Sequence, residues 1–118
     1  MNIEDYREYC LAKKGVSEGF PFDHNTLVFK VMNKMFALTN VQEFNSINLK
    51  CDPEKAIDLR DRYHAVVPGY HMSKKHWNTI TVNEDATDDE IYEWIDDSYN
   101  LIVKSLTKKL QAELKELG

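Results

Sequence analysis

The segment from Pro68 to Asn78 contains the densest group of side chains that could bind a ligand. Its eleven residues include two His, two Lys, one Trp, one Tyr and one Asn. On a loop, lysines can neutralise phosphates and aromatic rings can stack on bases. The alternative is that the aromatic side chains are half-buried packing groups with solvated lysines between them. The candidate binding residues are Tyr70, His71, Lys74, Lys75, His76, Trp77 and Asn78.

The strand that follows this segment predicts where Trp77 points. Side chains alternate between the two faces of a strand, so Trp77 lies on the opposite face from Ile80 and Val82. If those two aliphatic residues point into the core, we expect Trp77 to be exposed on an open sheet face. Lys30 and Lys50 have the same outward phase in their own strands. The alternative is that a helix end or a loop covers the ring.

Metal binding and nucleophilic catalysis lack supporting residue spacings. His71 and His76 are five residues apart, and Cys10 and Cys51 share no ligand spacing with them. Ser73 lies near His76, but no acid in the local sequence would orient the imidazole. The four glycines form no phosphate-binding loop. We therefore expect no enzyme activity, no cofactor and no metal.

Charge is distributed unevenly along the chain. The net charge is −5, but residues 1–83 hold 11 basic and 10 acidic residues, whereas residues 84–118 hold 4 and 10. The C-terminal part should repel phosphate, so a polyanion would have to approach the other side of the protein.

Length and cysteine content predict one cytoplasmic domain. A chain of 118 residues with 42% hydrophobic residues can bury one core, so we assign residues 1–118 to a single domain. Two cysteines without a CxxC spacing favour a reducing compartment, with one disulfide as the alternative. The N-terminus is acidic, and the longest apolar run, Met35–Leu38, is too short for a membrane span. We expect a monomer with no membrane contact.

Hydrophobic periodicity predicts an α+β fold. Asn2 is a good helix N-cap, Asp52-Pro53 is a helix start, and Thr87 with Glu90 forms a capping box. Thr107 could cap a second helix after a break. We expect helices over 3–14, 53–63 and from 88 onwards, strands over 26–32, 35–39, 47–51 and 78–82, and optionally a strand near 20–22.

Short turns between neighbouring strands favour a mainly antiparallel sheet, with the helices packed on one face. This leaves the other face open. The residues expected in the core are Leu27, Phe29, Leu49, Leu59, Ile80, Trp94 and Ile102.

Five blocks spread over nearly the whole chain resemble the MmcQ/YjbR family. They are Phe20-Pro21-Phe22, Leu27-Val28-Phe29-Lys30-Val31, Lys34-Met35-Phe36-Ala37-Leu38, Leu49-Lys50-Cys51-Asp52-Pro53 and the stretch from Pro68 to Thr79. The resemblance implies a frataxin-like (CyaY-like) two-layer sandwich and a DNA-binding protein with a double-wing arrangement. The sequence departs from the family at Thr107, where relatives often have Pro.

Two functions remain open from the sequence. The first is DNA binding through the 68–78 segment and the open sheet face. The second is a protein- or small-ligand-interaction module on the same face. An isoelectric point of 5.3 opposes the first, because duplex-binding proteins usually present a basic stripe.

Overall fold

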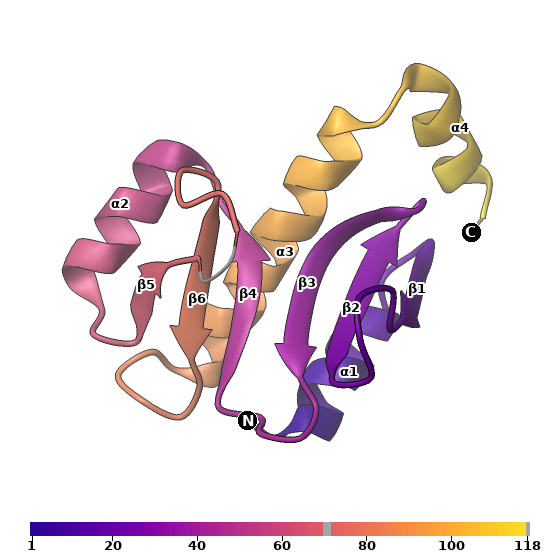
Figure 1. Cartoon of the computed structure of the whole chain (residues 1–118). Helices are drawn as coiled ribbons and strands as arrows, with labels where there is room; N and C mark the ends of the chain where they lie inside the picture. Colours follow the sequence, from indigo (N-terminus) through magenta and orange to yellow (C-terminus); the bar gives the residue numbers. More distant parts are fainter. Residues whose placement is uncertain (70–71, 118) are drawn as a thin grey trace.

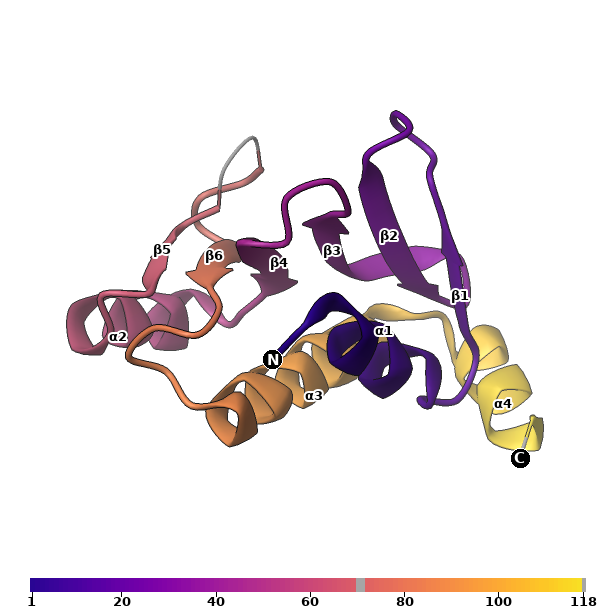
Figure 2. The same cartoon turned by 90° about the horizontal axis from the view of Figure 1, so that it is seen from below.

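An antiparallel sheet forms one layer of the protein, and helices cover one of its faces (Figure 1, Figure 2). The computed structural model describes residues 1–69 and 72–117. Over these residues six strands form one sheet in the order β1-β2-β3-β4-β6-β5, with every neighbouring pair antiparallel. The elements are α1 (Ile3–Leu11), β1 (Val16–Gly19), β2 (Thr26–Val31), β3 (Lys34–Asn40), β4 (Ser46–Lys50), α2 (Pro53–Arg62), β5 (Val66–Pro68), β6 (Trp77–Thr81), α3 (Asp88–Ser105) and α4 (Lys108–Glu116).

The helices leave the second face of the sheet uncovered. Figure 2 shows α1, α3 and α4 on one side of the sheet, while the β1–β2 connection and the described part of the β5–β6 connection lie on the other. The remaining helix, α2, lies beside β5 at the edge of the sheet (Figure 1). The predicted α+β class, antiparallel pairing and open face are therefore confirmed.

One continuous core lies between the sheet and the helices. It contains all seven residues predicted to be buried, which are Leu27, Phe29, Leu49, Leu59, Ile80, Trp94 and Ile102. These side chains come from strands and helices alike, so burying them fixes each helix against the sheet.

The end of the first helix, the position of the optional strand and the presence of β5 differ from the prediction. The helix α1 ends at Leu11, and Gly15 turns the chain at a φ of +75° directly into β1. The extra strand therefore precedes residues 20–22 instead of containing them. In addition, β5 was missed, because a three-residue edge strand carries too little alternation to be detected.

The β2–β3 hairpin turns one residue earlier than predicted. Met32 and Asn33 both have positive φ, 48° and 70°, as expected for a type I′ turn. Near the C-terminus the last helix breaks at Leu106, whose ψ of 154° is extended. Thr107 then caps α4 by accepting a hydrogen bond from Leu110 N, so the predicted second cap is present.

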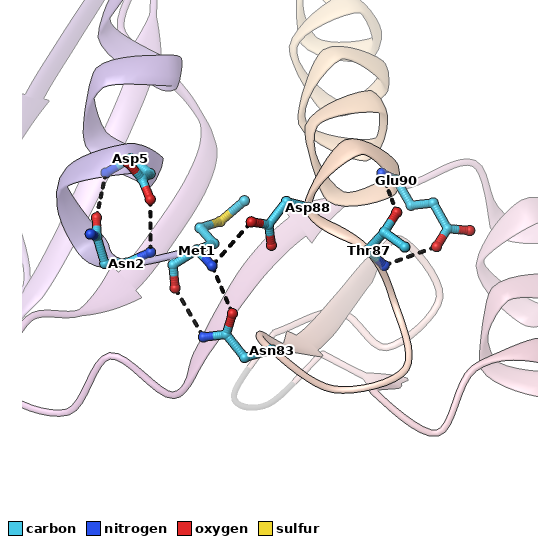
Figure 3. Close-up of polar contacts among 7 residues, drawn as sticks. All are labelled: Met1, Asn2, Asp5, Asn83, Thr87, Asp88 and Glu90. Carbon is cyan, nitrogen blue, oxygen red and sulfur yellow. Dashed lines mark hydrogen bonds and ion pairs between the residues drawn. The ribbon is translucent and has the colours of Figure 1, made fainter.

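Capping boxes begin α1 and α3 (Figure 3). Asn2 Oδ1 accepts from Asp5 N at 2.8 Å, and Asp5 Oδ2 accepts from Asn2 N at 3.2 Å. Thr87 and Glu90 make the same reciprocal pair at 3.2 and 2.9 Å. Each box satisfies backbone N–H groups that have no partner inside the helix. The predicted helix starts are therefore confirmed.

The N-terminal amine ties the starts of α1 and α3 together. It donates to Asn83 Oδ1 at 2.7 Å and lies 3.1 Å from Asp88 Oδ2, while Asn83 Nδ2 donates to Met1 O at 2.9 Å (Figure 3). Asn83 can face the amine because it adopts a φ of 61°, a conformation that asparagine tolerates.

Candidate functional site

The loop before β6 presents two lysines to solvent. Trp77 N and His76 N donate to Ser73 O at 2.9 and 3.2 Å, which closes a tight turn over residues 73–77. Lys74 and Lys75 occupy the exposed outer part of this turn. Neither lysine forms an ion pair with any residue that the structure describes. The turn therefore holds two adjacent positive charges ready for an external anion.

The turn is attached to the fold on two sides. Cys51 N donates to His76 O at 2.8 Å, and Gly69 N donates to Trp77 O at 2.8 Å. A Cβ on Gly69 would lie 2.8 Å from the Cβ of Trp77 and 2.9 Å from its carbonyl oxygen. Only glycine allows so close a backbone approach. His76 itself is half-buried.

Arg60, in the last turn of α2, holds the same loop from below. Its Nε donates to Asn78 Oδ1 at 2.7 Å, its Nη2 donates to Trp77 O at 3.3 Å, and Nη2 also contacts Lys74 O. A guanidinium suits this role because its donors form a rigid fork. Arg60 was not predicted as a site residue, because no sequence pattern links a helix arginine to residues 14 to 18 positions later in the chain.

The prediction that Trp77 is exposed is wrong. Its phase is as expected, because it lies on the face opposite Ile80, but only 7% of the residue is accessible. The ring packs in a second small cluster with Val28 and Leu38, and Met72 packs against it. The ring is therefore covered by Met72 of the loop and by side chains of β2 and β3, not by a helix of the described residues. Trp77 is a packing group and cannot stack on an external ring.

Asn78 is also removed from the surface. It lies on the helix-side face with Ile80 and is 1% exposed. Its Nδ2 has no hydrogen-bond partner among the described residues, while its Oδ1 receives Arg60 Nε. Asn78 thus serves to anchor Arg60. Of the remaining predicted site residues, Tyr70 and His71 lie outside the residues that the structure describes.

A hollow of about 700 Å³ lies on the open sheet face. Its lining includes Phe22 and Asp23 of the β1–β2 connection on one side, and Pro68 of β5 and Met72 of the loop before β6 on the other. Its sides are apolar side chains and uncharged hydroxyls and amides, with one acid. The lining residues are Phe22, Asp23, Thr26, Met35, Leu38, Thr39, Asn40, Ser46, Asn48, Val67, Pro68, Met72 and Thr79. Sequence analysis did not predict the hollow, because it is formed by five strands and two loops together.

Acidic side chains are excluded from the open face of the strands. Glu18 is the only acidic strand residue, and it lies opposite Phe29, on the helix side, where Arg7 binds it at 2.5 Å. Lys30 and Lys50 point the other way, as predicted from strand phase. The acidic segment from residue 84 to 97 belongs to α3 and the loop before it, in the opposite layer (Figure 2).

The carboxylate of Asp23, the acid in the hollow, is held by hydrogen bonds within its own loop. It accepts hydrogen bonds from Asn25 N at 2.8 Å and Thr26 N at 2.7 Å. These two bonds, with a third from the Thr26 hydroxyl, lower the pKa of the carboxyl. Asp23 is therefore ionised at neutral pH and closes the loop that carries Phe22.

The structure offers no catalytic thiol. Cys10 and Cys51 are buried and free, and burial raises the pKa of both, to about 11 for Cys51. Over residues 1–69 and 72–117, no group of three or more His, Cys, Asp or Glu side chains could hold a metal ion. No helix in the same ranges is long and apolar enough to cross a membrane.

Comparison with known proteins identifies the family. The YjbR family model matches residues 11–101. The chain belongs to the YjbR family. This match covers the whole sheet, the hollow, Arg60 and the 72–78 loop.

Two similar proteins are known from Escherichia coli. The protein YbdF of Escherichia coli O157:H7 is 36% identical over 97 residues, covering 81% of this chain and 80% of YbdF. YjbR of Escherichia coli K12 is 31% identical and covers 99% of this chain and 100% of its own length. Both are uncharacterised, so they assign no activity to this YjbR-family chain.

Solved structures of similar proteins share the architecture. The DR2400 protein of Deinococcus radiodurans, a DUF419 domain, superposes with a TM-score of 0.90 at 37% identity, covering 97% of this chain and 88% of that one. A Pseudomonas syringae protein gives a TM-score of 0.73 at 28% identity over 86% of this chain and 98% of its own.

Proposed function

We propose that this YjbR-family protein binds nucleic acid, DNA in the first instance, through the open face of its sheet and the adjoining 72–76 loop, without catalysing a reaction. One observation carries the proposal. The strands present no acid on the open face, while Lys30, Lys50, Lys74 and Lys75 make no ion pair with a described residue.

The lysines gather at one end of this face. In the strand register Lys50 lies opposite Trp77. Trp77 ends the 73–77 turn, which carries Lys74 and Lys75. Lys30 lies opposite Met35 at the same end of β2 and β3. Four positive charges at one end can bind consecutive phosphates.

The acidic net charge is compatible with this role. Several acids of α3 are neutralised within the helix layer, since Lys13 pairs with Asp96 and Lys55 pairs with Asp97 at 2.5 Å. The sheet separates the remaining acids of α3 from the open face (Figure 2), and salt screens charges over about 8–10 Å. The negative net charge of the chain therefore reflects acids on the helix side more than the charge of the open face.

A salt titration tests the proposal. Four phosphate contacts predict a slope of about −3.6 for log K against log salt concentration, and Lys74→Ala with Lys75→Ala should reduce its magnitude by about 1.8. The matched control is Lys108→Ala with Lys109→Ala, which removes the same charge from α4, on the helix side. Anisotropy of a labelled DNA duplex and of a labelled single strand provides the readout. If the unmodified protein binds neither DNA at low salt, the proposal is wrong.

A second candidate is a protein- or small-ligand-interaction module that uses the hollow. Its volume of about 700 Å³ falls within the range of about 300–1,000 Å³ usual for ligand sites. Its lining contains no lysine or arginine. Binding of this kind should be nearly independent of salt concentration, which separates it from phosphate-driven binding.

We also infer that the sandwich belongs to the frataxin-like class and that the protein is a cytoplasmic monomer. The single antiparallel sheet covered on one face supports the first inference. The two buried, free cysteines support a reducing compartment. Sedimentation of the purified chain tests the monomer.

A further inference from the structure

We propose that the hollow on the open face receives one unpaired base, with the adjoining phosphates held by Lys30 and Lys50, so that the preferred ligand is single-stranded nucleic acid. This inference rests on the proposed function and names the form of nucleic acid that the same face would select.

The apolar part of the hollow suits the flat faces of a base. Met35 and Leu38 on β3 and Met72 on the loop contribute thioether and aliphatic surface. Leu38 is 4% exposed, and Met35 and Met72 pack against the cluster that contains it. Methionine is polarisable and adapts its shape to an aromatic partner. The floor is therefore packed and ready to contact a ring.

The polar part of the hollow suits the edge of a base. Asn48 Oδ1 accepts a hydrogen bond from Thr79 Oγ1 at 2.5 Å, which orients the amide. Asn48 Nδ2 makes no hydrogen bond to any described residue, and neither does the hydroxyl of Ser46, two residues earlier. Neutral donors and acceptors of this kind recognise the hydrogen-bonding edges of unpaired bases.

Phe22 provides the aromatic surface that Trp77 cannot. It lines the hollow from the β1–β2 connection, and 65% of the residue is exposed. An exposed aromatic ring beside a depression that can hold a base is typical of stacking sites in proteins that bind single strands. The neighbouring Phe20 is 49% exposed but lines a different, smaller depression. Phe22 is therefore the stacking residue, and Phe20 is its natural control.

The charges on either side of the hollow orient the strand. Lys50 follows Asn48 by two residues on the same face of β4, about 7 Å along the strand. Lys30 lies opposite Met35, which lines the hollow. At the other end the ionised Asp23 would repel a phosphate. The backbone should therefore leave the hollow towards the lysines.

A duplex cannot make this contact without losing a base pair. Its bases are stacked and present only their edges in the grooves, whereas the hollow is bordered by Phe22 of the β1–β2 connection and by Met72 of the loop before β6. Extruding a base costs on the order of a few kcal/mol. A single strand avoids that cost, so it should bind more tightly than a duplex with the same phosphates.

The test compares three labelled ligands of equal length at low and physiological salt: an oligothymidine strand, the same backbone with abasic sites, and a duplex. We expect the oligothymidine to bind about tenfold more tightly than the abasic strand, because each stacked base contributes about 1–3 kcal/mol. Phe22→Ala should weaken oligothymidine binding by about tenfold and leave the salt slope unchanged. Phe20→Ala should change the affinity for oligothymidine less than twofold. Ser46→Trp, which fills the hollow, should act like Phe22→Ala.

The outcomes separate this inference from the proposed function. Equal affinity for the abasic and oligothymidine strands, or equal effects of Phe22→Ala and Phe20→Ala, with salt-dependent binding retained, would overturn the base-binding hollow and leave phosphate binding intact. Absence of binding to all three ligands at low salt would overturn both. Circular dichroism of each variant verifies that it is folded.

Discussion

Arg60→Ala should remove the attachment of the lysine-bearing turn to α2 and destabilise the fold. The guanidinium lies beneath residues 73–78, where it donates to Asn78 Oδ1 at 2.7 Å and to Trp77 O at 3.3 Å and contacts Lys74 O. These residues are 14 to 18 positions away in sequence. No other described side chain donates to Asn78, which is 1% exposed.

The expected loss follows from these contacts. Hydrogen bonds from a charged donor contribute about 1.5–3 kcal/mol, and a buried acceptor left without a partner costs about 1–3 kcal/mol. The two effects overlap, so we expect the free energy of unfolding to fall by about 2–4 kcal/mol. For a domain of this size that corresponds to a fall in Tm of roughly 10 °C.

Urea unfolding of four variants, compared with the unmodified protein, measures the effect. Arg62→Ala is the matched control, because this arginine lies on the same helix but makes only an exposed ion pair with Asp58 at 3.2 Å, an arrangement that adds little stability. Asn78→Ala and the double variant Arg60→Ala/Asn78→Ala complete a cycle. We expect a coupling free energy of about 1 kcal/mol or more between the two side chains.

Two results would refute this reasoning. One is an Arg60→Ala variant no less stable than Arg62→Ala. The other is a coupling free energy near zero, since the loss would then come from a source other than the Arg60–Asn78 contact. If the Arg60 contacts position the turn, Arg60→Ala should also weaken DNA binding, because Lys74 and Lys75 would be held only by the backbone hydrogen bonds of His76 and Trp77.

Two further predictions concern ionisable groups. The hydrogen bond from Thr87 N lowers the pKa of Glu90, and backbone N–H groups lower that of Asp23. The stabilisation by each carboxylate is complete above its unfolded-state pKa and is lost as the pH falls below that value, about 4.5 for Glu90 and about 3.8 for Asp23. Glu90→Gln and Asp23→Asn should therefore each flatten the acid limb of a stability–pH curve, and an unchanged limb would contradict the assignment. Because burial raises the pKa of both thiols, Cys10 and Cys51 should react slowly with Ellman's reagent at pH 8 and titrate as two thiols in denaturant; none in denaturant would indicate a disulfide.

Local signals in the sequence determined most of the elements. Capping boxes at Asn2 and Thr87, and Asp52 before Pro53, mark helix starts because they act within one turn. Alternation in the strands and helical spacing in α2 and α3 identified the core faces, and every residue predicted to be buried is buried. The side of the sheet on which Trp77, Lys30 and Lys50 lie was also predictable, because it depends only on strand phase.

The tertiary structure decided what covers each face and which distant residues meet. Strand phase states where Trp77 points, but only the packing of Met72 and Leu38 shows that the ring is buried. The Arg60–Asn78 contact and the hollow each join segments far apart in the chain.

The tertiary structure also decided which face of the sheet the charged residues lie near. Linear counting shows an acidic C-terminal third, yet only the packing of α3 behind the sheet separates those acids from the open face. Periodicity constrains neighbours within a few residues, whereas burial and binding depend on surfaces assembled from the whole chain. The elements, the core and the exposed lysines were therefore predictable from the sequence, whereas the burial of Trp77, the Arg60–Asn78 contact and the hollow were not.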